Sequence, residues 1–337
     1  MTPFIIPIFI SHQGCPHQCV FCNQGAIAGS TDVPVSPAQV AGLIAEQLAW
    51  PRKTGRQEEV QVAFYGGSFT CLDQERQQAY LRAVQPFLDR GQVAKVRLST
   101  RPDCLDLPTA LWLREQGVGL VEVGVQSLDE EVLLASRRGH DGAQVAAAFG
   151  ALREAGLQSC GQLMVGLPGD TPARAVASAR RLLEMGPDMV RIYPTLVVAG
   201  SPLAELYEQK KFQPWSLAKA VLVCARLKEI CEKARVKVIR LGLQPSQALK
   251  ASVLAGPFHP AFGEMVASRI FFKYLRSLLR RRPAGPALLR LSPRDRSLFS
   301  GVGKENLQRL QGLGLLKGVE VVFASKQPRF SAAILPG

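Results

Sequence analysis

Short apolar runs typical of strands alternate with amphipathic stretches typical of helices over roughly the first 200 residues. Six runs are predicted to be strands: FIIPIFI (4–10), VQVAFYGG (60–67), KVRLST (95–100), LVEVGVQS (120–127), CGQLMVGLPG (160–169) and MVRIYPTLV (189–197). The helices predicted between them include SPAQVAGLIAEQLAW (36–50), DQERQQAYLRAVQPFLDRG (73–91), PTALWLREQG (108–117) and TPARAVASARRLLEMG (171–186). This alternation predicts an α/β fold with a parallel sheet, either an open barrel or a doubly wound layer.

The residues with the greatest chemical potential follow the predicted strands. Cysteines follow the first strand, GGSFT ends the second, TRPD ends the third, QS ends the fourth and GLPG ends the fifth. In parallel α/β folds the carboxyl ends of the strands share one edge, and ligands bind there. We therefore expect a single site at that edge.

After about residue 200 the pattern changes to that of a second, smaller α+β module. A long helix (216–234) leads to the strand VKVIRLGL (236–243) and to a helix that ends in LRSLLRRRP (275–283). The segment 284–337 is predicted to contain the helical stretch SPRDRSLFSGVGKENLQRLQGLGLL and the strand GVEVVFAS. We therefore expect a core domain at 1–200 and a C-terminal extension at 201–337.

The positive charge is concentrated in this C-terminal part. From residue 237 onward there are 17 Lys and Arg against 4 Asp and Glu, a balance of +13 within a total of +14. Such a concentration favours an anionic partner, with nucleic acid as the leading candidate. The plainer alternative is a solvated basic surface. We expect the arginine run at 280–282 to be exposed.

Composition also limits the class of protein. With 47% apolar and 20% charged residues among 337, the chain is not a disordered one. The apolar start MTPFIIPIFI has no basic segment before it and is too short to cross a membrane. We therefore expect it to be a buried strand and the protein to be cytoplasmic, without membrane association.

Three of the eight cysteines form a cluster, Cys15, Cys19 and Cys22, with the spacing C-x3-C-x2-C. Thiolates suit zinc or iron–sulfur clusters, and a cubane held by three cysteines leaves one iron open to another ligand. The alternative is zinc, with His12 or His17 as the fourth ligand. The other five cysteines are expected to be small core residues: Cys71, Cys104, Cys160, Cys224 and Cys231.

At this point the sequence resembles the radical S-adenosylmethionine (SAM) superfamily, whose signature is C-x3-C-x-aromatic-C, matched here with Phe21 as the aromatic residue. The resemblance implies a partial (β/α)6 TIM-type barrel and a 4Fe–4S cluster whose open iron binds SAM. It implies reductive cleavage of SAM to a 5′-deoxyadenosyl radical that abstracts hydrogen from the substrate. It also implies an electron donor of the ferredoxin or flavodoxin type.

Further motifs resemble the elongator catalytic-subunit branch of that superfamily. FYGGSFT, with Gly66, Gly67 and Ser68, resembles the family's glycine motif, whose backbone holds the methionine amino group of SAM. The commoner form ends in Glu, whereas Gly-Gly-(Ser/Thr)-Phe is usual in this branch. STRPD, VEVGVQSLDEEVL, RRGH and MVRIYPTLV also resemble this branch, and VIRLGLQ and AGPFHPAFGE resemble its C-terminal extension.

The same resemblance assigns other SAM contacts. Gln126 and Arg138 would contact the ribose and carboxylate of SAM, and Gly166, Leu167 and Pro168 would lie against the adenine. Each motif also has a plainer explanation. The glycines could form an ordinary turn, Arg138 could complement a helix dipole, and Gln126 could belong to a buried polar network.

Tyr193 is either a packing aromatic or part of the site. The elongator subunit also carries an acetyltransferase domain, for which this chain is expected to have no room. RLQGLG (309–314) fits an acyl-CoA pattern, but its glycines are better explained as the end of a helix.

The sequence therefore predicts a radical SAM enzyme that abstracts hydrogen from an unidentified substrate, with tRNA or another RNA as the first hypothesis. A small molecule or a protein is the second hypothesis. The alternative from another class is a non-catalytic RNA-binding protein that keeps a structural iron–sulfur cluster.

Overall fold

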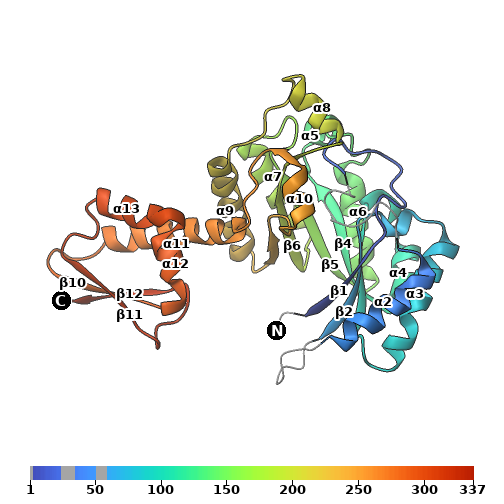
Figure 1. The fold of residues 1–337 in the computed structure, drawn as a ribbon, viewed down its shortest axis with the longest axis horizontal. Coiled ribbons are helices and arrows are strands. Elements are labelled where there is room, and N and C mark those ends of the chain that lie inside the picture. The colour runs from blue at the N-terminus through green and yellow to red at the C-terminus, as the bar shows by residue number, and fades with distance from the viewer. Residues whose placement is uncertain (1–2, 24–34, 51–58) are drawn as a thin grey trace.

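The computed structural model describes residues 3–23, 35–50 and 59–337. Its main body is a curled sheet of parallel strands in which each strand lies beside the preceding one, which confirms the partial barrel (Figure 1). From one edge to the other, the strands are β1 (Phe4–Phe9), β2 (Val60–Tyr65), β3 (Lys95–Thr100), β4 (Val118–Gln126), β5 (Gln158–Val165), β6 (Met189–Pro194) and β8 (Lys237–Leu241).

The sheet has seven strands, whereas the sequence predicted six. The segment expected as a strand of the C-terminal module forms β8, which pairs in parallel with β6. The helix before it, α9 (Leu217–Lys233), packs against α7 and β6 and so serves as one more crossover of the barrel. The local pattern of β8 did not predict its pairing with β6, because the residues of a strand do not by themselves determine which strand it pairs with.

Alternation along the central strand β4 separates an apolar outer face from a polar inner face. On β4, Val121 and Val123 are fully buried in the main core, whereas Glu122 and Gln126 line the interior of the barrel. Burial of each valine on the helix side stabilises the fold by about 1.5–3 kcal/mol. The same period of two therefore produces both the core and the lining of the cavity.

The helices share one continuous apolar core with this sheet. Helix α2 begins after Ser36 with Pro37 in its first turn, and Asp141 and Gln144 form a reciprocal capping box at the start of α6. The helices around the barrel are α2 (Pro37–Ala49), α3 (Gln74–Asp89), α4 (Leu107–Glu115), α5 (Glu130–Ala135), α6 (Gly142–Glu154), α7 (Pro172–Glu184), α8 (Pro202–Glu208), α9 and α10 (Gln247–Ser252).

Short elements follow the strands at their carboxyl ends. The 3-10 turn η1 (Phe69–Cys71) follows β2, and η2 (Pro102–Cys104) follows β3. A two-stranded ribbon pairs β7 (Val197–Val198) with β9 (Val253–Ala255). These segments give the loops at this edge fixed positions relative to the barrel.

The C-terminal module has its own small core and lies to one side of the barrel, reached through the long helix α11 (Phe262–Arg280) (Figure 1). Its mixed sheet has the order β11 (Val319–Phe323), β10 (Ala287–Leu291), β12 (Ala332–Pro336), beside α12 (Arg296–Ser300) and α13 (Glu305–Gly312). Only β11 was predicted among these strands. The predicted single helical stretch is broken into α12 and α13 by η4 (Val302–Lys304), which contains the left-handed Gly303. No helix in the described residues is both long enough and apolar enough to cross a membrane.

Candidate functional site

One cavity of about 700 Å³ opens at the carboxyl ends of the strands and continues into the barrel. It gathers residues from both edges of the sheet and from the loop after β1. The predicted site residues that line it are Cys15, Cys19, Cys22, Gly66, Gly67, Ser68, Gln126, Arg138 and Tyr193. The structure thus brings together most of the residues that the sequence singled out.

The cysteine loop follows β1 and lies against the glycine motif. Cys15 is exposed, Cys19 is buried and Cys22 is half-buried, and the Cys22 N–H donates to the Cys19 carbonyl at 3.1 Å. Within the ranges that the structure describes, no three His, Cys, Asp or Glu side chains stand close enough together to hold a metal ion. The three thiols nevertheless face the same cavity, as do His12 and His17.

The glycine motif fits closely against that loop. Gly66 adopts a left-handed backbone conformation, with φ of 86°. A Cβ added to Gly67 would stand 2.5 Å from the Gln13 carbonyl oxygen and 2.7 Å from that of Ile10, so no larger residue fits without movement of the backbone. The Ser68 N–H donates to the Gln13 carbonyl at 2.9 Å. The motif therefore fixes the loop that carries the cysteines.

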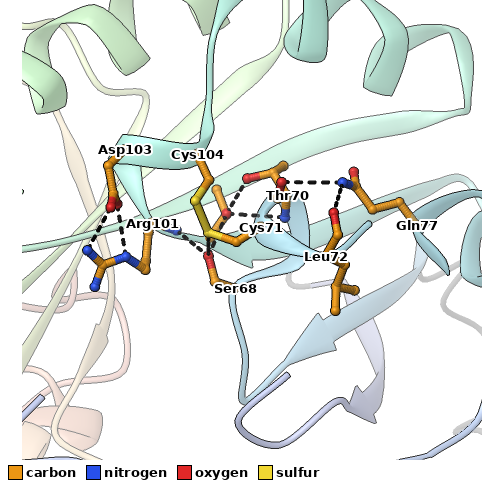
Figure 2. Close-up of a disulfide and its surroundings, with 9 residues drawn as sticks. Ser68, Thr70, Cys71, Leu72, Gln77, Arg101, Asp103 and Cys104 are labelled. Atoms are coloured by element: carbon orange, nitrogen blue, oxygen red, sulfur yellow. Dashed lines mark hydrogen bonds and ion pairs between the residues drawn. A yellow bond between two sulfur atoms is a disulfide. The ribbon is translucent and has the colours of Figure 1, made fainter. Parts of the chain in front are cut away.

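Ser68 connects the motif to the loop after β3. Its hydroxyl accepts a hydrogen bond from the Arg101 N–H at 3.0 Å and lies 3.1 Å from the Thr100 hydroxyl. It also lies 2.8 Å from the sulfur of Cys71 (Figure 2). Because Ser68 is 1% exposed, these contacts are shielded from water and hold the two loops together.

Cys71 and Cys104 form a disulfide, so the expectation that both are free core residues is wrong (Figure 2). They end η1 and η2, which follow the neighbouring strands β2 and β3, and their Cα atoms are 5.3 Å apart. Their separation of 33 residues hid this proximity in the sequence. Cys160, Cys224 and Cys231 are free and almost fully buried, as expected.

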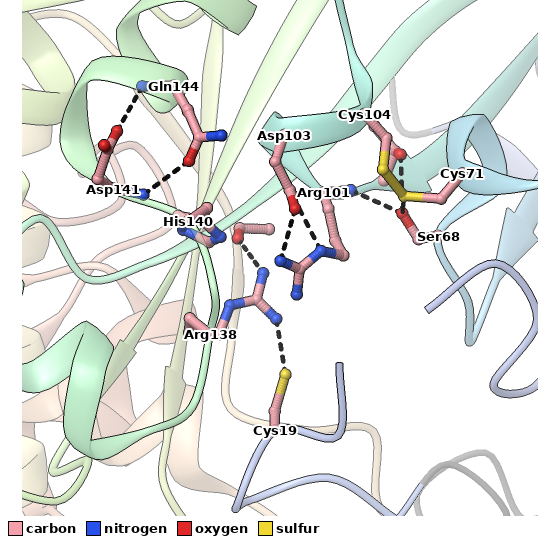
Figure 3. A network of polar contacts seen from close by, with 12 residues as sticks. Cys19, Ser68, Cys71, Arg101, Asp103, Cys104, Arg138, His140, Asp141 and Gln144 are labelled. Atoms are coloured by element: carbon pink, nitrogen blue, oxygen red, sulfur yellow. Dashed lines mark hydrogen bonds and ion pairs between the residues drawn. A yellow bond between two sulfur atoms is a disulfide. The ribbon is translucent and has the colours of Figure 1, made fainter. Parts of the chain in front are cut away.

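Arg138 reaches the cysteine loop from beyond the end of α5 (Figure 3). It is 6% exposed, and its guanidinium donates to the Cys19 sulfur at 3.1 Å and to the Gly124 carbonyl at 2.5 Å. Its Nε has no hydrogen-bond partner among the described residues. A buried cation with an unused donor, facing a thiol in a cavity, is suited to an anionic ligand.

A second arginine, Arg101 of the STRPD motif, lies nearby and was not predicted to be a site residue. Arg101 is 3% exposed and forms a two-point ion pair with Asp103, at 2.9 and 2.8 Å (Figure 3). Its remaining nitrogen, Nη1, has no hydrogen-bond partner in the described part of the chain. Arg101 also lines the cavity, which therefore has two cationic groups beside the cysteines.

His140 lies behind these two arginines and is 6% exposed (Figure 3). Desolvation, together with the charges of Arg138 and Arg101, lowers the pKa of His140 to about 4. Its Nε2 is 3.3 Å from the Val125 carbonyl. The ring is therefore neutral at neutral pH and supports the arginine layer without adding charge to it.

Gln126 ends β4 with a left-handed backbone, at φ of 64°, which is uncommon for a residue with a side chain. It is 4% exposed, and its amide oxygen is 3.4 Å from the Gln162 side-chain nitrogen. Such backbone strain is found preferentially at ligand sites, where surrounding contacts maintain it.

The GLPG segment is placed differently from the other predicted residues. Gly166, Leu167 and Pro168 are not among the residues that line the cavity, and Gly166 packs against the ring of Trp215. The Gly166 N–H donates to the Asp170 carboxylate at 2.7 Å, and desolvation raises the pKa of Asp170 to about 6. The expected adenine contact by this segment stays a prediction.

Several charged residues that were not predicted as part of the site lie deeper in the barrel. Glu122, Arg191 and Arg240 all line the cavity, and all three lie within apolar strands. That position was a usable signal, because a charged side chain inside a buried strand must have a partner or a function.

Comparisons with known proteins agree with this geometry. Residues 9–182 match the radical SAM superfamily and residues 187–271 match the radical SAM C-terminal domain. A tRNA uridine(34) acetyltransferase of Methanocaldococcus infernus is 29% identical over 268 residues, which cover 68% of this chain and 50% of that protein. Protein YhcC of Escherichia coli is 30% identical over 195 residues, covering 56% of this chain and 60% of YhcC. The chain thus spans only part of the length of these relatives.

Solved structures show the same architecture. The Elp3 protein of the archaeon Methanocaldococcus infernus, with its N-terminus deleted, has a TM-score of 0.62 at 21% identity, covering 82% of this chain and 64% of its own. Coproporphyrinogen III oxidase (HemN) from Escherichia coli has a TM-score of 0.50 at 19% identity, covering 69% and 53%. The superfamily match covers more than half of the sequence, including the cysteine loop, the glycine motif and Arg138, and this chain therefore belongs to the radical SAM superfamily.

Proposed function

We propose that this radical SAM enzyme holds a 4Fe–4S cluster on Cys15, Cys19 and Cys22, binds SAM beside it, and acts on RNA, with tRNA as the first candidate. The observation that carries the proposal is the convergence of the cysteine loop, the glycine motif and Arg138 on one cavity. When bound, the cluster and SAM supply a radical that removes a hydrogen atom from the substrate.

The residues present fit these cofactors. In the part of the chain that the structure describes, three cysteines and no fourth line the cavity, which would leave one iron of a cubane open for SAM. The unused donors of Arg138 and Arg101 point to an anionic group, such as a carboxylate. The absence of a side chain at Gly67 lets a ligand approach the backbone of the motif.

The roles of the remaining residues follow from their positions. Gln126 would hydrogen-bond the ribose of SAM from the end of β4, and Arg138 would bind its carboxylate. Gly66, Gly67 and Ser68 would hold its amino group through their backbone. Gly166, Leu167 and Pro168 keep their proposed place against the adenine. An electron donor of the ferredoxin or flavodoxin type would supply the electron.

Metal analysis tests the cluster. Anaerobically reconstituted protein is expected to hold the iron and sulfide of one 4Fe–4S cluster, and replacement of any of the three loop cysteines by Ala should abolish it, because two thiolates cannot retain the cubane. Cys231→Ala is the matched control, since this thiol is 1% exposed and lies in the core. Stoichiometric zinc without iron would instead support the site with His12 or His17.

Two observations support RNA as the substrate. Relatives that match most of this chain are named tRNA uridine(34) acetyltransferases. The C-terminal module also carries the excess positive charge, with Arg280 and Arg281 exposed at the end of α11. Acetyl transfer itself is not part of the proposal, because RLQGLG ends helix α13 and does not follow a strand.

The expectation that all of 280–282 is exposed is wrong for Arg282. Its guanidinium donates to the carbonyls of Gly285 and Lys317, both at 2.8 Å, and so holds the loop after α11 in place. Only Arg280 and Arg281 are therefore used in the binding test.

The test compares tRNA binding at several salt concentrations. If Arg280 and Arg281 contact phosphates, their joint replacement by Gln should weaken binding and flatten the log–log salt slope by about 1.4, from about 0.7 for each contact. Arg76→Gln with Arg82→Gln makes the same charge change on the exposed face of α3 and should leave the slope unaltered. A slope that does not change in the first variant would reduce the basic module to a solvated surface.

Activity then identifies the product. Incubation without oxygen, with SAM, dithionite and total tRNA, is expected to release 5′-deoxyadenosine and to alter a nucleoside in the tRNA digest. Release of 5′-deoxyadenosine without any altered nucleoside would favour a small-molecule or protein substrate. If neither appears in protein with an intact cluster, the non-catalytic alternative gains support.

A further inference from the structure

Below the proposed cofactor site, the cavity continues into a polar chamber within the barrel. We call this the inner chamber and define it by residues that line the cavity from four strands: Tyr65, Glu122, Arg191, Tyr193 and Arg240. They come from β2, β4, β6 and β8. None of them has a place in the proposed binding of the cluster or of SAM.

Among the described residues that line the cavity, Glu122 is the one acidic residue, and two arginines already pair with it. Its side chain is 1% exposed and forms an ion pair with Arg97, which also donates to it through Nε at 2.8 Å. Arg191 approaches the other carboxylate oxygen at 2.9 Å. One negative charge is thus opposed by two positive charges before any other residue is counted.

Arg240 adds a third positive charge without an acidic partner. It donates to the Gly242 carbonyl at 3.0 Å and to the Gln244 side-chain oxygen at 2.5 Å, and it takes part in none of the ion pairs of the described residues. Partly buried cations without counter-charge are costly, and an anion supplied by a ligand would offset that cost.

The hydroxyls of the two tyrosines both contact Arg191. Arg191 donates to the Tyr65 hydroxyl at 3.0 Å and to the Tyr193 hydroxyl at 3.2 Å. The Tyr65 hydroxyl donates a hydrogen bond to the Glu122 carboxylate at 3.1 Å, whereas Tyr193 donates to no acceptor among the described residues. Burial raises the pKa of Tyr193, so its phenol keeps the proton that a ligand could accept.

The opposite wall of the chamber is apolar. Ile5, Pro7 and Phe9 of β1 line it, and the ring of Phe9 lies 6.4 Å from that of Tyr65. A ligand here would therefore have a charged end toward β6 and β8 and an uncharged, flat or aliphatic part toward β1.

We propose that the inner chamber binds an anionic group of the substrate, a phosphate or a carboxylate, through Arg191, Arg240 and the hydroxyl of Tyr193. This inference rests on the proposed function, because it assigns the substrate's place relative to the cofactor site. A phosphate would come from a nucleotide of RNA, and a carboxylate from a small acid or an acidic side chain.

The test measures ligand binding to the anaerobically reconstituted enzyme by calorimetry, without turnover. The probes are uridine monophosphate, uridine and succinate. We expect at least one of the two anions to bind. Uridine should bind at least about tenfold more weakly than that anion, because it lacks the charged group to which the arginines would donate hydrogen bonds. Equal binding of all three probes, or of none, would overturn the inference.

Variants locate the binding in the chamber. Arg240→Gln should weaken the binding of the anion about tenfold or more. Tyr193→Phe should weaken it by about two- to tenfold, because one hydrogen bond is lost. Within the described ranges Arg240 forms no ion pair, and Glu122 pairs with Arg97 and Arg191 instead, so replacing Arg240 leaves Glu122 paired. Thermal unfolding then checks that the variant is folded. Arg76→Gln on the exposed face of α3 is the control and should not alter affinity. Unaltered affinity in both chamber variants would place the anion elsewhere.

The uridine monophosphate and succinate measurements also separate this inference from the RNA proposal. Binding of uridine monophosphate that depends on Arg240 supports a nucleotide in the chamber. Binding of succinate alone, with the same dependence, supports the anion site and contradicts RNA as the substrate. Replacing Arg280 and Arg281 by Gln should not alter the binding of uridine monophosphate or of succinate, because those two arginines lie in the C-terminal module and not in the chamber.

Discussion

Arg138 offers the sharpest test of the proposed cofactor site, because its guanidinium contacts Cys19 and lines the cavity. It donates to the Cys19 sulfur and to the Gly124 carbonyl, and its Nε has no hydrogen-bond partner among the described residues. We predict that Arg138→Gln weakens SAM binding while the enzyme still holds its cluster. Glutamine keeps a polar side chain but removes the charge and the fork of donors.

The magnitude follows from the interaction that is lost. A hydrogen bond to a charged group contributes about 1.5–3 kcal/mol, so losing the contact with the SAM carboxylate should raise the Kd about 10- to 150-fold. The iron content should not fall, because on the proposed function three thiolates would hold the cluster and Arg138 contacts only one of them.

The assay measures two quantities on the same sample. Iron and sulfide are determined after anaerobic reconstitution, and the Kd for SAM is determined by calorimetry. Arg137→Gln is the matched control, because Arg137 is the adjacent residue, is exposed and undergoes the same change of charge. The Kd of the Arg137→Gln variant for SAM should stay within about twofold of the value for the unaltered protein, as expected for a surface charge.

Two outcomes would refute this reasoning. An unchanged Kd in Arg138→Gln would show that the carboxylate of SAM lies elsewhere, with Arg101 as the next residue to test. Loss of iron with unchanged affinity per remaining cluster would show that Arg138 acts on Cys19 and not on SAM.

Three further predictions concern the support of the site. Replacing Cys71 and Cys104 together by Ser should lower the free energy of unfolding by about 3–4 kcal/mol, the loop-entropy value for their 33-residue separation; urea unfolding measures it, and the variant should lose the wild type's sensitivity to a reductant. Gly67→Ala should destabilise the protein by about 1–3 kcal/mol and weaken SAM, whereas Gly42→Ala, in open space on α2, should stabilise it by up to about 1 kcal/mol. Because the folded pKa of His140 is depressed from 6.5 to about 4, stability should be complete above pH 6.5 and fall by about 3 kcal/mol toward pH 4, and His140→Gln should flatten that loss.

Much of the barrel could be predicted, because its signals are local. Period-two apolar runs, the capping Ser36 and the left-handed glycines are all readable within a few residues, and parallel topology then places every strand's carboxyl end at one edge. The cysteine loop and the glycine motif were found in this way. The place of the seventh strand in the barrel sheet, the Cys71–Cys104 disulfide and the anchoring of Arg282 were missed, because each depends on a contact between segments distant in sequence.

The charges of the barrel could have been noticed but not interpreted. Arg191 and Arg240 each interrupt an apolar strand, and Glu122 does the same on β4. A single sequence does not tell which of these charges neutralise one another. The structure shows that Glu122 already pairs with Arg97 and Arg191, so the residue that stands out is Arg240, whose strand was not expected in the sheet.

The charges that line the cavity fall into two layers, and on the proposed function these layers have different ligands. The cysteine thiolates and the carboxylate of SAM would offset the charges of Arg138 and Arg101 at the carboxyl edge. The thiolates and the SAM carboxylate would not offset the charges of Arg191 and Arg240, because these arginines belong to β6 and β8 inside the barrel. A neutral substrate that entered above them would exclude water from Arg240 without giving it a counter-charge, at a cost that an anionic substrate avoids. The inner chamber would therefore select an anion even where the apolar wall of β1 contributes most of the contact area.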